Sequence, residues 1–260
     1  MNTTRQSAIL TVDDKESKER IMSTPTITGS TVIRWAGVGL MVAGLIFAAI
    51  QPIHPPDVVA SVTTGAWAVI TSLKTAMCLL FLLGITALYA RQVDKAGWLG
   101  LAGFLVLTVS WWLQTAFVVA EAFILPPLAS TAPAFVDGAL GISYGNTGQV
   151  DLGVLPTLYG VGVGLTYMLG GLLFGIATFR AAVLPRWPAA LLAVAATITP
   201  AAALLPHAQQ RLAAIPVALA LAWLGYALWS EGRTQSTQPL PGRAAAATAR
   251  AVVATNTAEV

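Results

Sequence analysis

Six long apolar runs dominate this sequence, and each is near the length of about 20 residues that an α-helix needs to cross a lipid bilayer. They cover residues 33–51, 66–89, 98–120, 154–178, 188–205 and 213–230. A segment inside a bilayer has no water to satisfy its backbone groups, so it must be a helix or part of a closed barrel. The runs lack the strict polar/apolar alternation of barrel strands. The sequence therefore predicts an all-α, polytopic membrane bundle with six transmembrane helices.

The charged residues orient this bundle. When the chain is threaded through a bilayer as six spans, twelve of its fourteen Lys and Arg residues fall on one side, and only Lys74 and Arg211 do not. The positive-inside rule makes that side cytoplasmic, so both termini are expected in the cytoplasm. Four tryptophans fall at predicted inner ends and one at an outer end, as in an interfacial belt: Trp35, Trp98, Trp187, Trp229 and Trp67.

The composition supports a lipid environment and argues against nucleic-acid binding. Hydrophobic residues make up 56% of the 260 residues and charged residues only 10%, which is unusual for a soluble domain. The net charge of +3 comes from basic residues on the side that the positive-inside rule makes cytoplasmic, so it does not indicate nucleic-acid binding. We expect the lipid bilayer as a partner and no nucleic acid. A membrane-protein partner or a second copy of the chain is a further expectation.

The two ends of the chain differ from its centre. Residues 1–31 and 231–260 are polar or low in complexity, and we expect both to be disordered cytoplasmic tails around a transmembrane domain at 32–230. Met22 leaves open an alternative start of translation. A cleaved signal peptide is the competing interpretation of the first run, but about 32 residues precede the run and its length is nearer to that of a span.

Two short segments resemble a known group of proteins. Phe179-Arg180-Ala181-Ala182-Val183-Leu184-Pro185-Arg186-Trp187-Pro188 resembles the inner connection of uncharacterised six-helix integral membrane proteins of actinobacteria, of the domain-of-unknown-function type. Arg34-Trp35-Ala36-Gly37 is similar to the opening of their first helix. The resemblance would cover about residues 32–230. It implies a multi-pass protein of the bacterial plasma membrane, and it brings no catalytic residues.

Lys74 is the most suggestive polar residue, because an ammonium inside a span costs about 2.5–3.5 kcal/mol on insertion scales and usually faces a partner or a water-filled cavity. Helical spacing places it on one stripe with Thr71 and Thr75. The next span carries a matching row, Ser110, Gln114 and Glu121, and the two helices are antiparallel neighbours. Three interpretations remain: a polar clamp between helices, a Lys74 that extends its stem to the membrane interface, or an outward-open pocket for a small anionic or amphiphilic ligand.

A second candidate site lies on the predicted outer face. Both histidines of the chain, His54 and His207, fall there, together with Asp57, Asp137 and Asp151, so a metal or proton-responsive site is conceivable. No HxxxH or HxxE spacing supports it, and histidines hydrogen-bonded to loop backbone are the ordinary alternative. We therefore expect no cofactor, and the sequence does not identify a metal for this candidate site.

Glycines and one long loop complete the prediction. Gly160, Gly164, Gly171 and Gly175 form two GxxxG units that predict close helix packing.

The outer loop 121–153 is expected to contain a short helix over 131–140, with Thr131 as its cap and Pro133 in its first turn. This loop acts either as a lid or as a plain connector.

No motif in the sequence names a reaction. HExxH, GxSxG and a phosphate-binding loop are absent, and the single cysteine, Cys78, excludes an intramolecular disulfide. We therefore favour a non-enzymatic binding, sensing or accessory role that uses the outer half of the bundle. A small-molecule transporter or permease with Lys74 in the pathway is the alternative, although the sequence shows no clearly interrupted helices in corresponding halves. A metal-binding protein or enzyme using His54 and His207 comes third.

Overall fold

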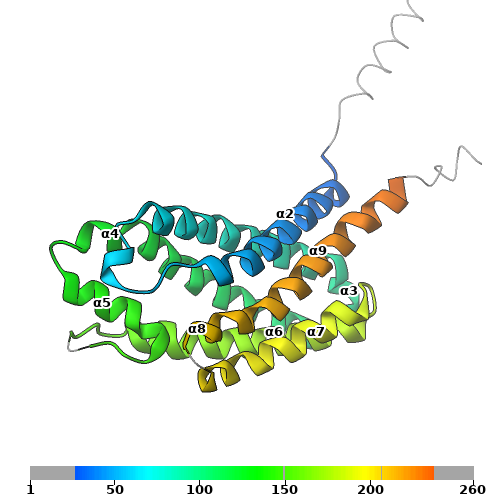
Figure 1. The fold of residues 1–260 in the computed structure, drawn as a ribbon. Helices are drawn as coiled ribbons and strands as arrows, with labels where there is room; N and C mark the ends of the chain where they lie inside the picture. The colour runs from blue at the N-terminus through cyan, green and yellow to red at the C-terminus, as the bar shows by residue number, and fades with distance from the viewer. Residues whose placement is uncertain (1–26, 149, 206, 237–260) are drawn as a thin grey trace, which may run out of the picture.

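A computed structural model describes residues 27–148, 150–205 and 207–236, and all regular elements in this part of the chain are helical. Long helices lie side by side in a bundle (Figure 1). The long elements are α2 (Gly29–Ile50), α3 (Gly65–Phe123), α6 (Gly164–Ala181), α7 (Arg186–Ile198) and α9 (Ile215–Ser236). The short elements are η1 (Gln51–Ile53), η2 (Val59–Ser61), α4 (Leu125–Leu128), α5 (Pro133–Gly141), η3 (Ile142–Tyr144), η4 (Pro156–Val163), η5 (Thr199–Leu204), α8 (His207–Gln210) and η6 (Arg211–Ala214).

Among the described residues, four helical segments are long and apolar enough to cross a membrane, judged by length and composition: Gly29–Ile53, Gly65–Phe123, Pro156–Ala181 and Arg211–Glu231. Arg186–Ile198 is a shorter apolar helix. The predicted tails overlap the described residues only at their edges, where α2 already begins at Gly29 and α9 continues to Ser236. The rest of both tails, including Met22, lies outside the described residues.

The longest element, α3, is a hairpin of two antiparallel arms. Its backbone leaves the helical region at Gly97, with φ 58° and ψ −166°, a conformation that is open essentially to glycine alone. The arms then run side by side, since Tyr89 stacks on Phe104 with centroids 4.6 Å apart and Phe81 meets Trp111 at 4.2 Å. The arms correspond to the predicted runs 66–89 and 98–120. The first arm extends further than predicted because Arg91, Gln92 and Lys95 are good helix formers.

Glycines allow the closest approach between helices. α2 packs on α9, α3 packs on α6, and α6 also packs on α7. A Cβ on Gly44 of α2 would lie 2.6 Å from the carbonyl oxygen of Ala218, too close for any other residue without a shift of one helix. Gly175 of α6 is similarly near α7, where a Cβ would lie 2.7 Å from the backbone nitrogen of Ala193.

The predicted glycine stripe on α6 is interrupted. Gly171 and Gly175 face α7, whereas Gly160 meets only Ile142 and Gly164 has nothing within 4 Å of an added Cβ. Gly160 lies in η4, a π-helix over Pro156–Val163, and the larger number of residues per turn displaces it from the stripe. Gly164 is the first residue of α6 and keeps the helical register of Gly171, but no atom of a neighbouring element comes within 4 Å of an added Cβ there.

The fifth predicted span, 188–205, is also irregular. Its α-helical part ends at Ile198, and η5 continues as a 3₁₀-helix over Thr199–Leu204. Pro200 has no backbone N–H to donate, which removes one helical hydrogen bond at this point. The outer segments of the fourth and fifth predicted spans are therefore not α-helical.

The predicted outer loop 121–153 is largely helical and shares a small core with the end of η2 and the start of α3. Val62, Trp67, Leu125, Val136, Ala139 and Leu140 are buried together there. Figure 1 places α4 and α5 at the end of the bundle opposite to the start of α2 and the end of α9. Pro133 begins α5 as predicted, but Ala132 precedes it and no side chain caps the helix, so the predicted Thr131 cap is wrong.

Candidate functional site

A cavity of about 710 Å³ opens within the half of the bundle that carries α5 and η3. Residues from α2, α3, η3, η4, α6, η5 and η6 line it. Four of the six residues predicted for the ligand pocket are in its wall: Lys74, Ser110, Gln114 and Glu121. Two residues predicted for the outer metal or proton site, His54 and Asp57, share the same wall.

The central feature of the cavity is an ion pair between Lys74 on the first arm of α3 and Glu121 on the second. Both side chains are nearly buried, with 11% and 8% of their surface exposed. The pair is aligned by Trp67, whose indole Nε1 donates a hydrogen bond of 3.0 Å to the backbone carbonyl of Glu121. The structure thus brings Lys74 and Glu121, which belong to the two polar rows, together across the hairpin.

His54, directly after η1, adds a third member to this pair. Its Nδ1 lies 2.7 Å from the carbonyl oxygen of Pro55, which can only accept, so Nδ1 carries the proton. Nε2 is then the acceptor, and it lies 3.4 Å from Nζ of Lys74. Burial, together with the positive charges of Lys74 and Arg211, lowers the pKa of the imidazole from 6.5 to about 4. His54 is therefore neutral near pH 7.

A second ion pair lies beside the first and joins distant parts of the chain. Arg211 of η6 pairs with Asp57, whose side chain is only 5% exposed, and Arg211 Nη2 also lies 3.3 Å from the Tyr144 hydroxyl of η3. Sequence reasoning placed Arg211 and Asp57 on the outer side but did not pair them. The sequence did contain a sign of this pairing, because Arg211 is the lone basic residue in the predicted outer loops and the other charged residues of these loops are carboxylates.

The remaining wall is mainly apolar and aromatic. Phe47 lies edge-on to Trp111 at a centroid distance of 5.6 Å, and Trp111 lies 6.1 Å from the Tyr167 ring. Neutral polar groups interrupt this surface: Gln114 Nε2 donates to the Tyr159 hydroxyl at 3.3 Å, and Ser110 Oγ donates to the Val163 carbonyl at 3.2 Å. The cavity therefore has a charged zone beside a larger aromatic zone, and the sequence did not reveal the aromatic residues as a group.

Several predicted site residues lie outside the cavity. Thr71 and Thr75 donate their hydroxyls to backbone carbonyls one turn earlier in α3, Trp67 and Thr71. Asp137 and Asp151 are exposed on the surface. Trp67, predicted at the membrane interface, is instead fully buried.

The geometry gives little support to a metal centre. His54 uses Nδ1 for Pro55 and Nε2 faces the Lys74 ammonium, so neither nitrogen is free for a metal ion. Within the described residues, no group of three or more His, Cys, Asp or Glu side chains is placed to hold one. The backbone of His207 lies in α8, but its side chain is outside the described part of the structure.

Comparisons with known proteins add no assignment: no protein-family model, no curated protein and no solved structure matches this chain.

Proposed function

We propose that this chain is a multi-pass protein of the bacterial plasma membrane with six spans and both termini in the cytoplasm. The two arms of α3 would each cross once, and α7 with η5 would supply the shortest span. Two observations support this. The start of α2, the reversal of α3 and the α6–α7 turn carry Arg34, Arg91, Lys95, Arg180 and Arg186, and the start of α2 and the end of α9 lie at the same end of the bundle (Figure 1).

Cysteine accessibility tests this topology. In a Cys78→Ala background, Asp137→Cys and Asp94→Cys place single thiols at exposed positions near opposite ends of the bundle. A membrane-impermeant maleimide applied to intact cells should label Asp137→Cys, and should label Asp94→Cys only after the cells are opened. The reverse pattern would overturn the orientation, and labelling of both in intact cells would overturn the six-span count.

We further propose that the protein binds a small amphiphilic molecule in the outer cavity, in a non-enzymatic sensing or accessory role. The observation that carries this proposal is the two-zone cavity of about 710 Å³. Its size suits a small organic ligand, since ligand pockets typically measure about 300–1,000 Å³. A polar head would meet the Lys74–Glu121 pair and His54, while an apolar body would lie against Phe47 and Trp111.

The charges of the cavity narrow the choice of ligand. Lys74 is paired with Glu121, Arg211 is paired with Asp57, and His54 is neutral. A strongly charged ligand would have to separate one of these pairs, whereas a neutral or zwitterionic head can hydrogen-bond to both members. We therefore expect a ligand without net charge.

Native mass spectrometry of protein extracted in mild detergent tests the binding proposal. We expect a retained small molecule whose occupancy falls in Gln114→Leu and in the double variant Lys74→Met/Glu121→Leu, which removes the charges without leaving one unpaired. Thr75→Val is the matched control, because Thr75 lies on the same stripe of α3 but outside the cavity. Equal occupancy in all variants would contradict the proposal. The same spectra give the oligomeric state.

A transporter is the second candidate, and the irregular helices favour it. The π-helix η4 and the 3₁₀-helix η5 both contribute residues to the cavity, including Tyr159, Val163 and Thr199. Substrate sites of many transporters lie between helices that are interrupted near the site. Counterflow of the retained molecule in proteoliposomes separates the two functions: transport would show exchange that depends on Lys74, and a binding protein would show none.

A further inference from the structure

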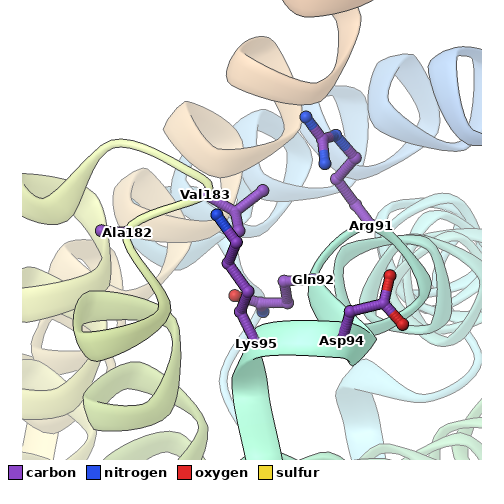
Figure 2. Close-up of a pocket in the computed structure, with 6 residues that line it drawn as sticks. All are labelled: Arg91, Gln92, Asp94, Lys95, Ala182 and Val183. Carbon is purple, nitrogen blue, oxygen red and sulfur yellow. The ribbon is translucent and has the colours of Figure 1, made fainter.

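A second hollow, of about 320 Å³, lies at the opposite end of the bundle from the cavity. Figure 2 shows the residues that line it. It forms where the reversal of α3 meets the turn after α6. Its lining consists of Arg91, Gln92, Asp94, Lys95, Ala182 and Val183. None of these residues belongs to the outer cavity, so the hollow is a separate candidate site.

The floor of this hollow is a buried amide. Gln92 is 1% exposed, and its Nε2 donates to Thr178 Oγ1 of α6 at 2.8 Å. Its Oε1 has no hydrogen-bond partner among the described residues. A buried acceptor without a donor is costly, so this position calls for a hydroxyl or a water molecule.

The rim of the hollow carries two cations, Arg91 and Lys95, and one carboxylate, Asp94. Arg91 and Lys95 lie one helical turn apart on α3, and Figure 2 shows Lys95 reaching toward Val183 while Asp94 projects away from Lys95. Arg91 Nε lies 2.9 Å from Glu231 of α9, but other guanidinium nitrogens remain for a further acceptor. Within the described part of the chain, the exposed Lys95 makes no ion pair.

We propose that this hollow binds the phosphodiester of a phospholipid headgroup. Phosphate oxygens accept hydrogen bonds from Lys95 and Arg91, and a headgroup hydroxyl supplies the donor that Gln92 Oε1 lacks. Trp98 and Trp187, which flank this end, are 85% and 78% exposed, as expected of side chains at headgroup depth. Because this end is the cytoplasmic one in the proposed topology, the site rests on that proposal and faces the inner leaflet, where basic pockets between helices bind phosphate headgroups.

Native mass spectrometry with added phosphatidylglycerol tests the assignment. We expect bound lipid in the wild type, and a loss of affinity of about fivefold in Lys95→Gln, the effect of about 1 kcal/mol for one cation near phosphate. Arg180→Gln removes an exposed charge at the same end but outside the hollow, and should change little. Lys95→Arg should retain the lipid. Because Lys95 is exposed, these substitutions leave the packing of the bundle intact.

The alternatives give distinct results. Equal lipid loss in Lys95→Gln and Arg180→Gln would overturn a defined site and leave only general attraction to charge. Displacement of the lipid by millimolar inorganic phosphate would show a site for free phosphate instead of a lipid. Binding in detergent does not depend on orientation, so retained lipid together with a reversed cysteine-labelling pattern would refute the topology alone.

Discussion

Trp67 and Glu121 are 54 residues apart in sequence, yet the Trp67 indole donates a hydrogen bond of 3.0 Å to the Glu121 backbone carbonyl. This bond joins the start of the first arm of α3 to the end of the second. It fixes the height of Glu121 relative to Lys74, which lies two turns along from Trp67. The ion pair at the centre of the cavity therefore depends on the alignment of the hairpin.

The Lys74–Glu121 pair should show strong coupling. Lys74→Met alone leaves a buried carboxylate without its partner, so we expect a loss of about 3–5 kcal/mol in the free energy of unfolding. Lys74→Met/Glu121→Leu removes both charges and should recover most of this loss. Reversible unfolding in detergent measures both variants, and a double variant as unstable as the single one would contradict the pairing.

The stability of the protein should fall with acidification because of His54. The imidazole lies just outside the first apolar segment, and its folded pKa of about 4 is below the 6.5 of the unfolded chain. The unfolded state therefore binds more protons between pH 6.5 and 4. The His54 contribution is complete above pH 6.5 and is lost at up to about 1.4 kcal/mol per pH unit as the pH falls through this window.

A variant isolates this contribution. His54→Gln should flatten the dependence of unfolding free energy on pH between 6.5 and 5. A wild-type profile with the same slope as His54→Gln would show that the imidazole titrates normally.

The reversal of α3 should tolerate only glycine. Gly97→Ala places a Cβ in a strained backbone conformation, with an expected cost of about 1–3 kcal/mol, although no neighbouring atom blocks the side chain. Gly164→Ala is the matched control, since Gly164 is helical and equally open. It should be neutral or stabilising by up to about 1 kcal/mol. Thermal unfolding of both variants in one detergent checks this ordering.

The crossing of α2 and α9 should be sensitive to volume. Gly44→Val forces the two helices apart, because the added carbons meet the Ala218 carbonyl and Ala222. We expect a loss of about 1–3 kcal/mol, in the range of overpacked cores. Gly39→Val lies on the same helix, where the nearest atom to an added Cβ is a flexible Leu80 methyl at 3.2 Å, so it should cost less. Equal losses would point to a general effect of valine in α2.

Several local features followed from sequence patterns alone. The apolar runs located the long helices, because helical spans require continuous apolar sequence. The polar rows that contain Lys74 and Glu121 were expected on neighbouring helices, because consecutive antiparallel helices with a short connection lie side by side. The aromatic wall was missed because Phe47, Trp111 and Tyr167 look like ordinary core residues until three helices converge.

The sequence by itself determined that this chain forms long apolar helices, since these follow from local composition and order. Only the tertiary structure decided that His54 meets Lys74 and that Asp57 meets Arg211 in the wall of one cavity. Those features depend on the distances between segments far apart in the chain. The packing of helices sets these distances through close glycine contacts and side-chain volume, which no local pattern encodes.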